Sequence, residues 1–136
     1  MTTTTSPVAD PGGSGAADPP AIALDSVVID TDDPAGLSRF YSALLGLPIV
    51  EEDEAWVSLQ GADGRALAFQ LAINHRRPTW PSADVPQQYH LDLRVSDLEA
   101  AGAYAESLGA TRVRNAGGES FVVYTDPSGH PFCLCR

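Results

Sequence analysis

The chain carries the same helix pattern twice, and this internal duplication limits the folds that it can adopt. In the first copy, Ser26 lies seven residues before Asp33, and Gly46 follows Asp33 by thirteen residues. In the second copy, His90 lies seven residues before Asp97, and a glycine follows Asp97 by twelve residues. Each copy combines an aspartate suited to cap a helix, apolar residues at helical spacing and a terminal glycine. We therefore expect one structural unit written twice.

Runs of alternating or β-branched residues flank each predicted helix, which is typical of strands. The predicted strands cover residues 22–30, 48–53, 55–60 and 65–73 in the first copy, and 89–95, 111–116, 120–126 and 131–136 in the second. This pattern predicts an α+β fold of two tandem βαβββ modules. We expect module one at residues 22–75, a linker at 76–87 and module two at 88–136.

Residues 1–21 consist mainly of Thr, Ala, Gly and Pro, with almost no large apolar side chain. Such a segment cannot bury enough apolar surface to offset the entropy lost on ordering, so we expect a disordered N-terminal tail. It lacks the basic and apolar regions of a secretory signal. The two cysteines, Cys133 and Cys135, are badly placed to pair because they lie two apart on one predicted strand. These features predict a reduced, cytoplasmic protein.

The formal net charge of -10 limits the partners of the chain. Nucleic acids and anionic membranes attract a cationic face, so we expect neither as a partner. A neutral or cationic small molecule is compatible with this charge as a partner. All eight basic residues are arginines, so chemistry that needs a lysine amine is excluded.

Five segments carry a family resemblance: LDSVVIDTDDPAGLSRFYSALLGLPIV, LAFQLA, PTWP, QQYHLDLRVSDLEAAGAYAESLGA and YTDPSGHPFCLCR. Over residues 22–136 the chain resembles the vicinal oxygen chelate superfamily, which has the glyoxalase and bleomycin-resistance fold. It looks most similar to glyoxalase-like domain proteins of unassigned activity. The resemblance implies a curled mixed sheet around a cavity. It also implies a homodimer, because family members often complete the cavity at a subunit boundary.

The resemblance places the metal ligands of metal-dependent relatives at Ser26, Gln70, His90 and Cys133. Serine and glutamine bind divalent metals poorly, and the carboxylate that such a site needs is missing. We therefore expect no functional metal site at these degenerate positions and favour no cofactor. A bound divalent metal is the disfavoured alternative.

Period-two alternation predicts which side chains face the cavity. Ser26 and Asp30 share one strand face, and His90, Asp92 and Arg94 share another. The alternative is an ordinary sheet face open to solvent. His90 is our candidate acid/base residue, with Asp92 or Asp30 as its carboxylate partner, although a strand histidine can also be purely structural.

Two further residues are candidates for the cavity wall. Cys133 is either a thiol activated by His90 or an inert buried thiol. Trp80, between two prolines, either lines the cavity or anchors the linker. The complete set of expected ligand-binding residues is Ser26, Asp30, Gln70, Arg94, Trp80 and Cys133.

Two classes of function fit these features. The first is a binding protein for a small molecule, similar to the bleomycin-resistance branch, whose acidic surface suits a cationic ligand. The second is a lyase or isomerase that uses His90 as acid/base. A metal-dependent glyoxalase or dioxygenase fits less well, because two of its four ligand positions lack a strong donor.

Overall fold

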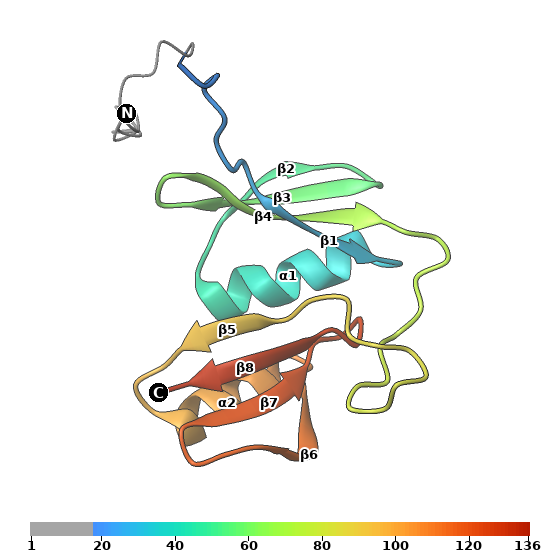
Figure 1. Cartoon of the computed structure of the whole chain (residues 1–136), viewed down its shortest axis with the longest axis vertical. Coiled ribbons are helices and arrows are strands. Elements are labelled where there is room, and N and C mark those ends of the chain that lie inside the picture. The colour runs from blue at the N-terminus through green and yellow to red at the C-terminus, as the bar shows by residue number, and fades with distance from the viewer. Residues whose placement is uncertain (1–17) are drawn as a thin grey trace.

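The computed structural model describes residues 18–136, which form two successive groups of one helix and four strands (Figure 1). The part of the predicted tail at residues 1–17 lies outside the described residues. The first group contains β1 (Val27–Thr31), α1 (Pro34–Leu45), β2 (Ile49–Glu52), β3 (Trp56–Gly61) and β4 (Gly64–Leu71). The second contains β5 (Leu91–Arg94), α2 (Leu98–Ser107), β6 (Thr111–Gly117), β7 (Phe121–Thr125) and β8 (Pro131–Cys135). The predicted α+β duplication is confirmed.

The strands form two mixed sheets of four strands each. The first sheet has the order β1-β4-β3-β2 and the second has the order β5-β8-β7-β6. In each sheet the module's first strand pairs in parallel with its last strand, and the other pairs are antiparallel. The identical strand order shows that the repeat seen in the sequence is also a repeat in the structure.

The helix ends follow the predicted capping chemistry. The Asp33 side chain accepts a hydrogen bond of 3.0 Å from the backbone N–H of Gly36, and Asp97 accepts one of 3.1 Å from Ala100. Gly46 ends α1 in the left-handed conformation, with φ of 68°. A side chain is strained in that conformation, so glycine is favoured there. No helix within residues 18–136 is long and apolar enough to cross a membrane.

The predicted start of the first strand at Ile22 was wrong. Residues 18–26 form neither helix nor strand, and the side chain of Ile22 is 88% exposed. The reason lies in the register, because Val27 pairs with Leu67 in the parallel ladder. In this register Leu24 would pair with Gly64, the first residue of β4, so a β1 that began at Ile22 would run past the end of its partner strand.

Aromatic side chains join the two modules into one core. α1 lies between the first sheet and β5 (Figure 1). On α1, the Tyr41 ring stacks on Phe69 of β4 with centroids 5.8 Å apart. Phe40 and Tyr41 also contact Phe132 of β8, at 5.9 and 6.3 Å. Such aromatic contacts each bury a large apolar area, so α1 packs against the cores of both modules.

A buried carboxylate also links the modules. Asp126 Oδ2 accepts a hydrogen bond of 2.6 Å from the Tyr41 hydroxyl of α1. Its Oδ1 accepts hydrogen bonds from the backbone N–H groups of Ser128 and His130, at 2.9 and 3.0 Å. Burial raises the pKa of Asp126, and these hydrogen bonds act in the opposite direction.

Further polar contacts surround this carboxylate. The Ser128 hydroxyl lies 2.7 Å from Thr31 Oγ1, and His130 Nε2 lies 2.8 Å from the Asp30 carbonyl oxygen. His75 Nε2 lies 2.9 Å from the Ser128 carbonyl oxygen. The turn before β8 is therefore bound to β1, to α1 and to the segment after β4.

We expect Asp126→Ala to lower the free energy of unfolding by roughly 3 kcal/mol, because it removes the acceptor of three buried donors. Urea unfolding followed by circular dichroism measures this change. Asp32→Ala is the matched control, since Asp32 is exposed in the loop before α1, and we expect a change within about 0.5 kcal/mol. If the two variants lose the same free energy of unfolding, the contacts of Asp126 do not stabilise the packing of the two modules.

Candidate functional site

The second sheet presents an open face on the side away from its core. In the parallel ladder, Asp92 of β5 lies opposite Cys133 of β8, and Arg94 lies opposite Cys135. Asp92 and Arg94 are exposed, whereas Leu93 between them packs against the core. The period of two therefore separates polar from apolar side chains on this strand.

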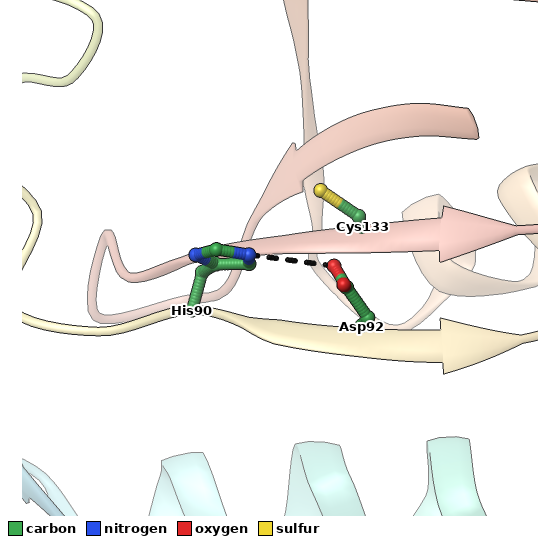
Figure 2. A group of neighbouring side chains, drawn as sticks. All are labelled: His90, Asp92 and Cys133. Carbon is green, nitrogen blue, oxygen red and sulfur yellow. Dashed lines mark ion pairs between the residues drawn. The ribbon is translucent and has the colours of Figure 1, made fainter.

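An imidazole, a carboxylate and a thiol lie close together on this face, as Figure 2 shows. His90 directly precedes β5, and its Nε2 lies 3.4 Å from Asp92 Oδ1. One donor atom each of His90, Asp92 and Cys133 lies within 4.8 Å of the others. The structure thus brings together both candidate acid/base residues and the candidate thiol. We call these three residues the His-Asp-Cys cluster.

The cluster suppresses ionisation of its thiol. Burial, followed by the charge of the Asp92 carboxylate, raises the pKa of Cys133 to about 11. A thiolate is the nucleophilic form of cysteine, so Cys133 carries little of that form at neutral pH. A thiol activated by His90 would need a lowered pKa, so the raised pKa favours the alternative of an inert thiol.

A hollow of about 190 Å³ adjoins the cluster. Trp80 of the linker lines it together with His90 and Cys133, so the structure brings these three expected residues together. Sequence reasoning missed Phe121 as a wall residue, although alternation along β7 places Phe121 and Val123 on the same face as Cys133. The remaining lining residues are Gln87, Val123 and Pro131.

The expected site residues of module one lie on the other sheet. Asp30 and Gln70 are opposite each other in the β1–β4 ladder, and both are exposed. The Ser26 hydroxyl donates a 3.4 Å hydrogen bond to Asp25. Because α1 lies between the first sheet and β5 (Figure 1), the structure does not bring Ser26 and Gln70 to the His-Asp-Cys cluster within one chain.

The ladders also show which positions correspond between the two modules. With Ser26 matched to His90, Val28 corresponds to Asp92. Val28 lies opposite Ala68, as Asp92 lies opposite Cys133. The first-module counterpart of Cys133 is therefore Ala68. Among the four positions that the resemblance implied for a metal, strong donors occur only on the second sheet.

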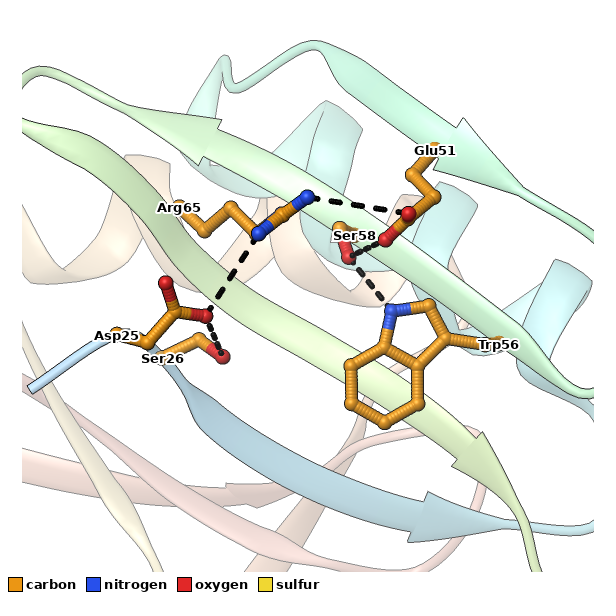
Figure 3. A network of polar contacts seen from close by, with 6 residues as sticks. All are labelled: Asp25, Ser26, Glu51, Trp56, Ser58 and Arg65. Atoms are coloured by element: carbon orange, nitrogen blue, oxygen red, sulfur yellow. Dashed lines mark hydrogen bonds and ion pairs between the residues drawn. The ribbon is translucent and has the colours of Figure 1, made fainter.

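A polar network covers the open face of the first sheet (Figure 3). Trp56 Nε1 donates a 2.8 Å hydrogen bond to the Ser58 hydroxyl, which donates a 3.0 Å bond to Glu51. Arg65 lies 3.8 Å from Glu51 and 3.9 Å from Asp25, as two ion pairs. Sequence reasoning missed Glu51 and Arg65, because they meet only through the register of three strands.

A fold of two βαβββ modules with polar residues on the open sheet faces defines the glyoxalase and bleomycin-resistance class. The sequence profile of the glyoxalase-like domain matches residues 26–135, and the chain belongs to this family.

Solved structures have the same fold. A protein designated ATC0852 from Agrobacterium tumefaciens is 22% identical, with a TM-score of 0.65 over 85% of this chain and 98% of that one. A possible glyoxalase from Bacillus cereus is 12% identical, with a TM-score of 0.63 over 85% and 100%. A glyoxalase/bleomycin resistance protein/dioxygenase family enzyme from Burkholderia phytofirmans PsJN is 17% identical, with a TM-score of 0.62 over 81% and 94%. No protein of curated function matches this chain. At these identities the likeness shows the fold alone.

We expect the alkylation of Cys133 to report its raised pKa. In Cys135→Ser, with a chelator present, the iodoacetamide rate is expected to rise about tenfold per pH unit between about pH 7 and pH 10, because the thiolate fraction rises in proportion. Mass spectrometry of the alkylated protein measures the rate. N-acetylcysteine is the reference thiol, and a protein rate that levels off near about pH 8.5 would contradict the raised pKa.

Proposed function

We propose that this glyoxalase-like protein binds a small molecule at the open face of its second sheet, without the four-strand metal centre of metal-dependent relatives. The observation that carries this proposal is the hollow between Trp80 and Phe121, with the His-Asp-Cys cluster at its side. Ligand sites typically combine an apolar wall with a few convergent polar groups. Both parts are present here.

The lining of the hollow indicates the chemistry of the ligand. Trp80, Phe121 and Val123 supply an apolar wall that suits a flat or aliphatic body. The carboxylate of Asp92, whose side chain is 65% exposed, is available to a cationic group. We therefore favour a ligand with an apolar body and a positive charge.

A second copy of the chain is the proposed cover of this site. Val28 on the first sheet and Phe121 on the second are 43% and 38% exposed, so each open face offers apolar area to a partner. Both faces also carry charges of each sign, Glu51 and Arg65 on one and Asp92 and Arg94 on the other, which can pair across an interface. We propose a homodimer in which the first sheet of one copy covers the second sheet of its partner, giving the curled cavity and bringing Ser26, Asp30 and Gln70 towards the ligand.

Ligand binding without turnover is expected to raise the melting temperature. A panel of cationic amphiphilic antibiotics, bleomycin included, provides the probes for thermal shift. Native mass spectrometry measures the copies per complex and any retained molecule. We expect Trp80→Ala or Asp92→Asn to weaken binding at least about tenfold, which corresponds to about 1.4 kcal/mol.

Asp84→Asn is the matched control, because Asp84 is an exposed linker carboxylate outside the hollow. We expect it to bind the probe like the wild type. Equal binding by Asp92→Asn and Asp84→Asn would contradict the role of Asp92. A panel without any shift, and no retained molecule, would contradict cationic ligand binding.

A lyase or isomerase reaction is the second candidate, favoured by the pairing of His90 with Asp92 at 3.4 Å. An imidazole beside a carboxylate can accept and return a proton near neutral pH. In this case His90→Ala should abolish turnover of a substrate found by screening, while the melting temperature stays unchanged. The assay contains a chelator, and unchanged turnover would remove His90 from the mechanism.

A metal-dependent glyoxalase or dioxygenase reaction remains the least supported candidate. Ser26 and Gln70 offer weak donors on the first sheet, and the counterpart of Cys133 there is Ala68. The resemblance requires a carboxylate among the ligand positions, and neither Gln70 of module one nor Cys133 of module two supplies it.

A further inference from the structure

We infer that His90, Asp92 and Cys133 form a three-ligand site for a borderline-soft divalent cation such as Zn²⁺, contained entirely within module two. The site differs from the four-strand arrangement of metal-dependent relatives. Asp92 is a ligand in it, and module one supplies none. The inference does not depend on the proposed small-molecule function, since the metal would bind in the absence of an organic ligand. A metal ion at this site would compete with a cationic ligand for the Asp92 carboxylate.

The separation of His90 and Asp92 supports metal coordination. Their Nε2 and Oδ1 atoms lie 3.4 Å apart, which is longer than the usual hydrogen bond of about 2.9 Å. Four-coordinate zinc holds a nitrogen and an oxygen ligand about 3.4 Å apart, given bonds of about 2.1 Å and tetrahedral angles. The distance between these two atoms therefore matches that between two ligands of one zinc ion.

Cys133 needs only a small adjustment to join them. Its sulfur lies within 4.8 Å of one donor atom each of His90 and Asp92, whereas a zinc-bound sulfur lies about 3.6 Å from a neighbouring ligand atom. The three donor atoms must therefore approach one another by up to about 1 Å to share one ion. Figure 2 shows all three side chains on the same side of β5 and β8.

The backbone fixes the site to neighbouring strands. Asp92 and Cys133 are direct partners in the parallel β5–β8 ladder. His90 lies two residues before Asp92, so period-two alternation places it on the same face. Ligands on paired strands are held more precisely than ligands on loops.

The donor set selects the kind of metal. An imidazole nitrogen and a thiolate favour Zn²⁺ or Co²⁺ over Mg²⁺ and Ca²⁺, which prefer oxygen ligands. When the metal–sulfur bond forms, the Cys133 thiol releases its proton to solvent. The carboxylate and thiolate then balance the two positive charges of the ion, and a water molecule can fill the fourth position.

Cobalt provides a direct readout of thiolate coordination in the full-length protein. After treatment with a chelator and its removal, Co²⁺ titration should give a sulfur-to-cobalt charge-transfer band that saturates at one ion per chain. Zn²⁺ should abolish the band by displacement, whereas Mg²⁺ should leave it intact. We expect Cys133→Ser to lose the band, and His90→Gln or Asp92→Asn to weaken Co²⁺ affinity at least about tenfold.

Cys135→Ser is the matched control. Cys135 lies on the same strand and face as Cys133, but opposite Arg94 and outside the cluster. We expect this variant to keep the band and the affinity of the wild type. Far-ultraviolet circular dichroism of every variant verifies that the fold is intact.

Several outcomes would overturn the inference. These are the absence of a band in the wild type, equal loss in Cys133→Ser and Cys135→Ser, and unchanged affinity in Asp92→Asn. Loss of affinity in Gln70→Ala with none in Asp92→Asn would place the metal at the four-strand positions instead. Each of these results leaves the proposed ligand function open to its own thermal-shift test, because no organic probe is present.

Discussion

The buried carboxylate of Asp126 is the contact on which the arrangement of the two modules depends. One of its oxygens is bound by the Tyr41 hydroxyl of α1, and the other orders the turn that leads into β8. A buried charge without hydrogen bonds is costly, so this carboxylate favours the one arrangement that satisfies it. The same turn sets where β8 begins, and β8 carries Cys133. The position of the thiol therefore depends on contacts in the turn just before its strand.

The elements that sequence analysis predicted correctly are those governed by local chemistry. Both helices follow from an aspartate cap and apolar spacing, and the duplication predicts the shared βαβββ order. The start of β1 failed because strand length depends on a partner strand that is distant in sequence. Two separate sheets with α1 between them were also not foreseen, since the packing of α1 rests on Phe69 and Phe132 from different modules.

The candidate site shows the same division. Alternation placed His90 and Asp92 on one face, but their distance from Cys133 depends on the β5–β8 register. His75 and His130 received no role from the sequence, because their burial arises from contacts with the turn and with β1. The raised pKa of Cys133 also lay beyond sequence analysis, because its cause is the burial of this thiol and the nearby carboxylate.

The correspondence between the two ladders shows that one backbone plan can carry two different sets of side chains. Where module two has His90, Asp92 and Cys133, module one has Ser26, Val28 and Ala68. At these matched positions the imidazole, carboxylate and thiol groups therefore lie only in the C-terminal half. An architecture that is written twice need not contain the same site twice.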